Sequence, residues 1–530
     1  MLPPRKLVQL EPACWVVRPL SAAAQLAPVT AVRPAERTGS DPYGELSSAL
    51  LEAKSVLDRI PERDYTQLAR ELDVYGALKR RLRAAYGLPV VTNATLKMYE
   101  LLSTYGLLLD DKAATPPTAA TSLSAATPPT AATSPTAATS PAAATTLSAA
   151  TSPAAAASPA AATSPAAAAA AAASPAAAAA APLGAATATP PGSPLVVRAF
   201  CNAELPGAFL IALSQYVTGR LPRLTSSPVE FDWVASSYLP PAAATADTSY
   251  LDDQYGIYAR HRSRWLMGPR PNALPAGEAP VSGDVTDSSV VAAIADAVHQ
   301  RYGETGGPAA PRHSGATLYT SDAGIDVTSD YSSQEELTVV LNFGQVVCGL
   351  LSLAPGGALV TKQYTFFTEF NRELIALLST LFDCLRIIKP VTSRPANSEV
   401  YLVGTGFRGV DRALADGLLD LLTEMREWES GRGDGAGRPH AGTAAGRFCL
   451  LRGGMAACPE TDAQLLEIAS ELTRSQIKYL REIDLVYKAA RAMRKPFHRT
   501  LKIFTEAAIE TATTNWMAAN PMARLVGDPV

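Results

Sequence analysis

The 530-residue sequence is poor in the residues that bind metals or form disulfides. Its six cysteines are scattered without a Cys-x-x-Cys pair, and its five histidines are equally dispersed. Neither a metal site nor a disulfide framework is predicted, and we expect a reducing, intracellular compartment such as the cytoplasm. The start of the sequence, MLPPRKLVQLEPACW, lacks the apolar core of a secretory signal peptide, which agrees with that expectation.

One long stretch carries no charge. Residues 113–197 consist almost wholly of Ala, Thr, Ser and Pro, in loose repeats such as TPPTAAT and SPAAA. Regularly spaced prolines interrupt any helix that the alanine runs begin, and large apolar side chains are too few to offset the entropy of ordering. The alanine runs are also too short to span a membrane. This composition predicts a disordered insert.

The remaining sequence divides into four further parts. We predict an irregular N-terminus over residues 1–42, a helical segment over 43–112, an α/β core over 198–410, and a helical extension over 411–530. Within the helical segment, Asn93 is the predicted N-cap of the helix NATLKMYELLSTYGLLL. In the core, strands and helices alternate, which predicts an α/β fold with a largely parallel sheet. The last two strands follow one another without a helix and could pair antiparallel. The net charge of −3 neither favours nor excludes a nucleic-acid partner.

Three predicted strands of the core end on a charged residue. The phrases TLYTSDAGID, GGALVTKQYTFF and KPVTSRPANSEVYLVGTGF place Asp322, Lys362 and Glu399 at strand ends. In open α/β sheets, ligands and catalytic groups collect at the ends of strands. Two carboxylates and a lysine at such positions indicate an active site.

The phrase FCNAELPGAF predicts a tight turn between the first core strand and a helix, with Glu204 just before Pro206 and Gly207. Small residues let a ligand approach the backbone, and the helix N-terminus can receive a carboxylate. The turn is not G-x-G-x-x-G, so a nucleoside carboxylate such as S-adenosylmethionine fits it better than a dinucleotide. An ordinary strand-to-helix turn is an equal alternative. Asp284 could bind an adenine or a ribose, or could cap the helix that begins near Ser288, as could Asp287.

Together these phrases resemble the RNA ribose 2′-O-methyltransferases of the FtsJ/RrmJ type. That family carries a Lys-Asp-Lys-Glu tetrad on a Rossmann-like class I fold that binds S-adenosylmethionine. The resemblance implies a tetrad of Lys97 in TNATLKMYELL, Asp322 in YTSDAGID, Lys362 in GGALVTKQY, and Glu399 in SRPANSEVYLVGTGF. Here the uncharged insert separates Lys97 from the core, at a loop-closure cost of about 1–2 kcal/mol.

The resemblance also implies the cofactor contacts. NAELPGAF is similar to the family's cofactor-binding turn in cap-type enzymes, and Asp284 and Asp322 would complete the site. The residues implied in the turn are Glu204, Leu205, Pro206, Gly207, Ala208 and Phe209. KMYELL, NAELPGAF and the WLM segment resemble the cap 2′-O-methyltransferases of large nucleocytoplasmic DNA viruses, of the African swine fever virus and giant-virus type. Such a protein would act in the host cytoplasm or the virion.

The expected reaction is methyl transfer to a ribose 2′-hydroxyl of RNA, at the first transcribed nucleotide of capped mRNA. Lys362 would be the general base, with its pKa lowered by burial and by nearby positive charge. Asp322 would orient Lys362, and Glu399 and Lys97 would hold the ribose. Alternatives are methylation of ribosomal or transfer RNA, and a non-catalytic RNA-binding subunit. Other capping enzymes are candidate partners; neither a membrane nor a metal is implied.

Two segments could contact RNA. The run SYLDDQYGIYARHRSRWLMGPR offers aromatic rings for stacking bases, or packs on the core as a lid. A basic helix over residues 478–502 could bind the RNA backbone, or present a solvated face.

Overall fold

The computed structural model of the protein describes residues 13–18, 41–88, 90–108, 194–225, 227–239, 253–267, 282–303, 314–325, 334–431, 444–493 and 497–524. The predicted insert lies outside these ranges as far as Ser193. The described elements belong to one unit, formed by Met1–Thr115 and Gly192–Val530. No helix in these ranges combines the length and the apolar character needed to cross a lipid bilayer.

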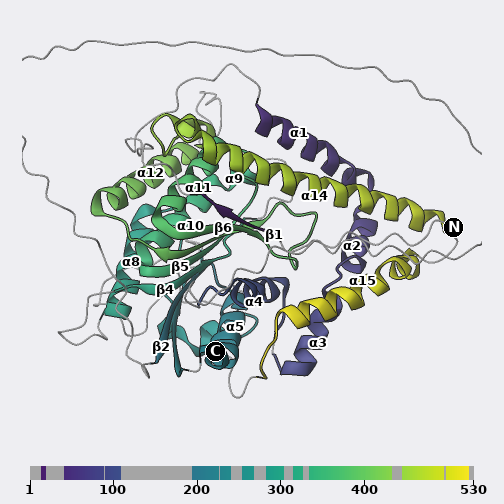
Figure 1. The fold of residues 1–530 in the computed structure, drawn as a ribbon, viewed down its shortest axis with the longest axis horizontal. Coiled ribbons are helices and arrows are strands. Elements are labelled where there is room, and N and C mark those ends of the chain that lie inside the picture. The colour runs from purple at the N-terminus through teal and green to yellow at the C-terminus, as the bar shows by residue number, and fades with distance from the viewer. Residues whose placement is uncertain are drawn as a thin grey trace, which may run out of the picture. The chain divides into compact units, whose positions relative to one another are not determined.

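The described residues contain one sheet with the strand order β1-β6-β7-β5-β4-β2-β3 (Figure 1). Pairing is parallel from β3 through β2 and β4 to β5, and antiparallel between β5 and β7, β7 and β6, and β6 and β1. The strands are β1 Ala13–Val17, β2 Leu195–Asn202, β3 Val229–Ala235, β4 Ala316–Ser321, β5 Leu353–Gln363, β6 Phe382–Lys389 and β7 Val400–Phe407.

The predicted α/β fold is confirmed, and β6 and β7 pair antiparallel as expected. The sheet as a whole is mixed rather than largely parallel. Parallel neighbours need a crossover connection, whereas β6 and β7 are joined by a loop over residues 390–399 that contains no helix.

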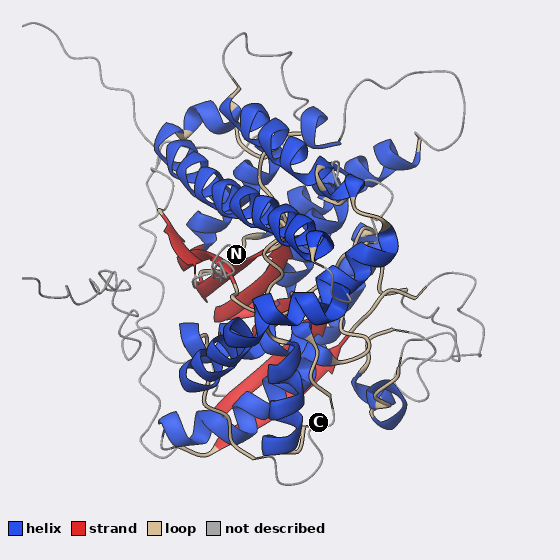
Figure 2. Ribbon diagram, turned by 90° about the vertical axis from the view of Figure 1, so that its right-hand side faces the viewer, coloured by secondary structure: helices blue, strands red, loops and turns tan. Residues whose placement is uncertain are grey.

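Helices cover both faces of the sheet (Figures 1 and 2). Helices α8, α10, α11 and α14 pack on one face, and α4 and α5 pack on the other. The helices before the core are α1 Pro42–Ser55, α2 Glu62–Glu71, α3 Gly76–Tyr86 and α4 Asn93–Tyr105. Those of the core are α5 Ala208–Ser214, α6 Leu221–Thr225, α7 Ile257–Arg260, α8 Ser288–Gly303, α9 Gln334–Leu337, α10 Val339–Ser352 and α11 Glu369–Leu381. The extension contains α12 Arg412–Ser430, α13 Ala444–Arg447, α14 Pro459–Ala492 and α15 Phe497–Ala519.

Side chains of the central strands alternate between two hydrophobic clusters. On β5, Leu359 belongs to the cluster under α10 and α11, and Val360 belongs to the cluster under α4. Because successive strand residues point to opposite faces, Lys362 shares the face of Val360 and points toward α4. Tyr401 on β7 lies in the same cluster as Val360.

Three local features differ from the sequence-based prediction. The N-terminus over residues 1–42 is not wholly irregular, because Ala13–Val17 forms an edge strand that pairs with β6. Strand β2 begins at Leu195, three residues before the expected border of the core. Helix α4 is capped by Thr92 instead of Asn93; the Thr92 hydroxyl accepts the backbone N–H of Thr95 at 3.2 Å.

The sheet contains a topological switch point. From β2 the chain moves to β3 on one side and then returns to β4 on the other side of β2. A crevice forms at such a point, outside the carboxyl ends of the strands. Asn202 ends β2, and Asp322 directly follows β4.

Replacing residues 113–190 with a flexible Gly/Ser linker of about 20 residues is expected to leave the fold and function intact. Because closure entropy grows with the logarithm of loop length, the shorter loop should raise the free energy of unfolding by about 1 kcal/mol. Chemical unfolding and a methyl-transfer assay on both proteins check this. An inactive or unfolded shortened protein would contradict the prediction of a passive insert.

Candidate active site

The first charged pair of the site joins α4 to the loop before β7. Lys97 Nζ lies 2.9 Å from Glu399 Oε1 and 3.0 Å from Oε2. Both side chains are more than 90% buried. The Ser393 hydroxyl donates to Glu399 Oε1 at 3.0 Å, so this carboxylate is held from two sides.

The second charged pair lies at the carboxyl ends of β4 and β5. Lys362 Nζ donates to the backbone carbonyl of Asp322 at 2.7 Å and lies 3.3 Å from Asp322 Oδ1. Tyr401 links the two pairs: its hydroxyl donates to Asp322 Oδ1 at 2.9 Å, and Lys97 Nζ lies 5.4 Å from the centre of its ring. The structure therefore brings all four predicted tetrad residues into one cluster.

The electrostatics of Lys362 differ from the expectation. Burial lowers its pKa, but the charges of Asp322, Tyr364 and Glu399 outweigh burial and hold the pKa above its ordinary value. The predicted lowering of the pKa is thus wrong for the protein alone, because carboxylates surround this amine more closely than cations do. For Glu399, burial raises the pKa, and Lys97, Lys362 and Lys389 overcome this and hold it well below its ordinary value.

Glu100 fixes the position of α4 one turn after Lys97. Its carboxylate accepts the backbone N–H of Val391 at 2.8 Å, the Thr392 hydroxyl at 2.9 Å and the Trp516 indole N–H at 3.4 Å. Burial raises the pKa of Glu100 to about 7. The helix carrying Lys97 is thereby fastened to the loop carrying Glu399 and to α15, although the chain between α4 and the sheet is long.

Lys389 holds the other end of the same loop. Its Nζ donates to the backbone carbonyls of Asn397 at 2.5 Å and Glu399 at 2.6 Å. Burial lowers the pKa of Lys389 to about 7. The sequence analysis identified neither Glu100 nor Lys389 as a residue of the site. Lys389 could have been found, because it lies at the end of a strand, as Lys362 does.

Gly324 leaves room for the amine of Lys362. A Cβ built on Gly324 would lie 2.8 Å from Lys362 Nζ and 3.3 Å from the Tyr364 hydroxyl. Any larger residue at this position would displace the amine. Tyr364 is a further member of the cluster that the sequence did not suggest, and burial raises the pKa of its hydroxyl.

Glu204 lies inside the predicted cofactor turn and points into the protein. Its Oε1 accepts the backbone N–H of Leu210 at 2.8 Å, in the first turn of α5. Glu204 therefore takes up one of the backbone N–H groups in the first turn of this helix. Gly207 adopts φ 110°, and a Cβ there would lie 2.4 Å from Ile257 Cδ1, which explains the need for glycine.

Residues 282–284 form no strand, and residues 268–281 before them lie outside the described ranges. Asp284 Oδ1 accepts the backbone N–H of Thr286 at 3.0 Å and the Thr286 hydroxyl at 2.7 Å. Its Oδ2 pairs with Arg426 on α12 at 3.3 Å. Asp287, which also pairs with Arg426, accepts backbone N–H groups at the start of α8. Asp287, rather than Asp284, therefore caps α8; the sequence had left both residues as candidates.

A buried polar side chain ends β2, at the switch point where a ligand crevice is expected. Asn202 is 98% buried and donates to the Ser321 hydroxyl at 3.1 Å. Its Oδ1 has no hydrogen-bond partner in the described part of the chain. An acceptor left unpaired inside a protein is costly unless a ligand donor meets it. This position, beside Asp322, therefore fits a polar cofactor that binds between β2 and β4.

The described part of the aromatic run packs on the core as a lid. Tyr258 and Trp265 are buried and lie edge to face, 5.5 Å between ring centres. Arg264 pairs with Asp232. These rings are not open to stack RNA bases, because they fill the space beside β3. Across the described ranges, no group of three His, Cys, Asp or Glu side chains could hold a metal ion.

Comparison with known proteins agrees with this geometry. The family model described as FtsJ-like methyltransferase matches residues 269–407. The chain is 41% identical over 207 residues to the "Probable methyltransferase EP424R" of African swine fever virus, which covers 39% of this chain and 44% of that protein. It is 28% identical over 225 residues to the mouse "Cap-specific mRNA (nucleoside-2'-O-)-methyltransferase 2", covering 42% of this chain and 26% of that protein.

A third relative is the "Uncharacterized protein L511" of Acanthamoeba polyphaga mimivirus, 29% identical over 232 residues, which are 43% of this chain and 25% of that protein. In each case the match spans less than half of the relative's length. Residues 269–407 thus match an FtsJ-like methyltransferase domain, as the sequence motifs predicted.

Glu204→Gln is expected to alter the pH dependence of stability. Burial raises the pKa of Glu204 to about 8, whereas in the unfolded chain it is about 4.3. The folded state therefore binds the extra proton between these values, so the wild type loses stability as pH rises from about 4 to about 8. Relative to the Gln variant, the loss should reach a few kcal/mol. Unfolding at pH 5, 6.5 and 8 measures it, with exposed Glu467→Gln as control; parallel wild-type and E204Q curves would refute it.

Proposed function

We propose that the protein is an S-adenosylmethionine-dependent RNA methyltransferase that methylates the ribose 2′-hydroxyl of the first transcribed nucleotide of capped mRNA. The observation that carries the proposal is the tetrad cluster. Lys97, Asp322, Lys362 and Glu399 come from distant parts of the chain and meet at the carboxyl edge of the sheet. Cap specificity is inferred from the mouse relative, which is named a cap-specific mRNA methyltransferase.

The cofactor supplies an electrophilic methyl group on a sulfonium. Asn202 at the end of β2, the turn Glu204–Phe209 and Asp322 after β4 are the residues proposed to surround it. Glu204 acts there by fixing the first turn of α5. Asp284, which is paired with Arg426, would present its remaining lone pairs toward an adenine or a ribose.

Lys362 is proposed to accept the proton of the 2′-hydroxyl. Because its pKa is raised in the protein alone, this amine is protonated at neutral pH and must lose a proton before it can act as a base. Positive charge brought into the cluster by the cofactor favours that loss. Asp322 and Tyr401 orient the amine, and Glu399 with Lys97 positions the ribose, so that much of the acceleration comes from alignment of the reacting groups.

Mass analysis of a short capped RNA after incubation with protein and S-adenosylmethionine tests the proposal. A gain of one methyl group, mapped to an alkali-resistant linkage at the first nucleotide, is the expected result. Methylation of an uncapped structured RNA instead would point to ribosomal or transfer RNA. Absence of methyl transfer to any RNA, with cofactor bound, would overturn the catalytic proposal.

A further inference from the structure

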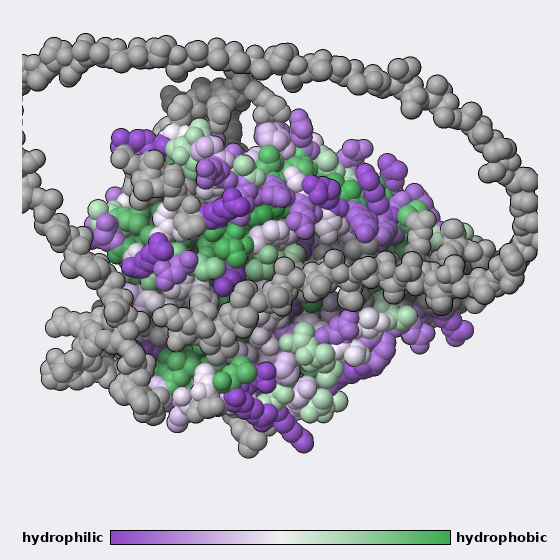
Figure 3. Space-filling view, in the orientation of Figure 1, coloured by the Kyte–Doolittle hydropathy of each residue, from purple (hydrophilic) through white to green (hydrophobic). Residues whose placement is uncertain are grey.

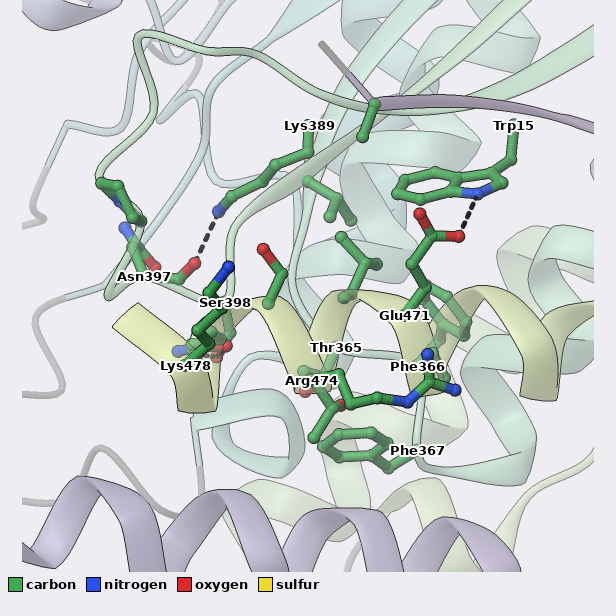
Figure 4. A pocket seen from close by; sticks show the side chains of 18 of the residues that line it. Trp15, Thr365, Phe366, Phe367, Lys389, Asn397, Ser398, Glu471, Arg474 and Lys478 are labelled. Atoms are coloured by element: carbon green, nitrogen blue, oxygen red, sulfur yellow. Dashed lines mark hydrogen bonds between the residues drawn. The ribbon is translucent and has the colours of Figure 1, made fainter. Parts of the chain in front are cut away.

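A cavity of about 560 Å³ lies beside the loop over residues 390–399, on the side of the sheet covered by α14 (Figure 4). It is bordered by β1 and α14 and by the residues that follow β5. Ser398 and Val400, which flank Glu399, line it. Lys389 also lines it and donates to the carbonyl of Glu399 at 2.6 Å. Whatever occupies this cavity therefore contacts the loop that carries a tetrad residue.

Unpaired positive charge borders the cavity. Arg474 and Lys478 line it, and Arg481 lies one turn farther along the same exposed face of α14. In the described part of the chain, none of these three cations has an ion-pair or hydrogen-bond partner. By contrast, Lys488 and Arg491 on the same helix pair with Asp484 and Asp64. Figure 3 shows hydrophilic side chains along this part of the surface. Among the cations of α14, those without a partner in the described part of the chain therefore lie at or next to the cavity.

Two half-buried aromatic rings also line the cavity, Trp15 from β1 and Phe367 from the segment after β5. The Trp15 indole donates to Glu471 Oε2 at 3.2 Å, which fixes the ring over the cavity (Figure 4). Cations that bind phosphates together with rings that stack bases are the usual features of a single-stranded nucleic-acid site.

We propose that this cavity binds a nucleotide of the single-stranded RNA substrate next to the one that is methylated. Arg474 and Lys478 hold its backbone phosphates, and Trp15 and Phe367 contact its base. The inference rests on the proposed function. Both β1 and α14 lie outside residues 269–407, so the contacts of Trp15, Arg474 and Lys478 come from parts of the chain that the family match does not include, whereas Phe367 lies within it.

The charge contribution is tested with the double variant Arg474→Gln/Lys478→Gln in the full-length protein. Its matched control is Lys488→Gln/Arg491→Gln, which removes two paired cations from the same helix. Fluorescence anisotropy with a short capped RNA should show about a tenfold weaker Kd for the first variant. Its slope of log affinity against log salt should fall by about 1.4, the value for two lost phosphate contacts on a single strand. In methyl transfer, KM for RNA should rise while kcat stays near the wild-type value.

Equal Kd and salt slope in the two double variants, with the wild type active on RNA, would overturn the inference and leave the proposed function standing. A wild type that binds RNA but transfers no methyl group would overturn the proposed function. The comparison of RNA affinity between the two double variants would still decide whether the cavity binds RNA.

The base contact is tested separately by Trp15→Leu. We expect about a tenfold loss of RNA affinity at unchanged salt slope, since stacking is uncharged. Val16→Ala, an exposed neighbour on the same strand, is the control, and equal affinities in these two variants would refute base stacking.

Discussion

Lys362→Ala is expected to abolish methyl transfer while leaving the fold and cofactor binding intact. Loss of a general base typically lowers a rate by about 10²–10⁴-fold. The fold should survive because the Lys362 amine lies at the sheet edge and hydrogen-bonds to Asp322, and Asp322 keeps the Tyr401 hydroxyl as a partner. Single-turnover rates, circular dichroism and calorimetric titration with S-adenosylmethionine together measure these expectations. Full activity in this variant would refute the assignment.

Lys362→Arg tests whether Lys362 acts through its positive charge or by accepting a proton. A guanidinium stays protonated throughout the accessible pH range, and Gly324 leaves little space beside the native amine. We therefore expect Arg to be as inactive as Ala. In the wild type, the raised pKa of Lys362 in the free protein means that the deprotonated fraction grows with pH, so log kcat/KM should rise with a slope of about 1 from neutral pH upward. A flat profile would assign Lys362 a permanently charged role.

The clustering of Asp322, Lys362 and Glu399 was predictable because they stand in short phrases near readable strand ends, whereas Lys97, on α4, came only from the family resemblance. Asp322 follows β4, Lys362 lies at the end of β5 and Glu399 directly precedes β7, and alternation along β5 fixes the face on which Lys362 lies. The pKa of Lys362 was not predictable, because it depends on the close approach of Asp322, Tyr364 and Glu399 from three different segments.

Contacts between distant segments account for the other features that the sequence did not reveal. Glu100 reads as an ordinary helix residue, yet it meets Val391, Thr392 and Trp516 across about 300 to 400 positions. Strand β1 was missed because five residues flanked by prolines carry little periodic signal. The sequence also did not predict that Glu204 caps the start of α5. Glu204 accepts the Leu210 N–H only because the backbone of the turn brings the two together.

Lys97→Met is expected to lower both stability and activity. The substitution leaves Glu399 buried without its closest cation, and breaking a buried pair costs about 3 kcal/mol or more. Misplacement of the ribose should lower kcat by about 100-fold. Lys79→Met is the matched control: Lys79 pairs with Asp73 at 2.9 Å on neighbouring α3, outside the cluster, so its loss should affect stability without changing kcat.

Adding Glu399→Gln to Lys97→Met separates the two effects. With both charges removed, the uncompensated buried carboxylate is gone, so most of the lost stability should return. Activity should not return, because neither an amide nor a thioether can hold the ribose as the ion pair does. Unfolding and single-turnover measurements on the wild type, both single variants and the double variant give the two coupling energies. If stability and activity recover together, the Lys97–Glu399 pair supports the fold alone, and the site reduces to Lys362, Asp322 and the tyrosines around them.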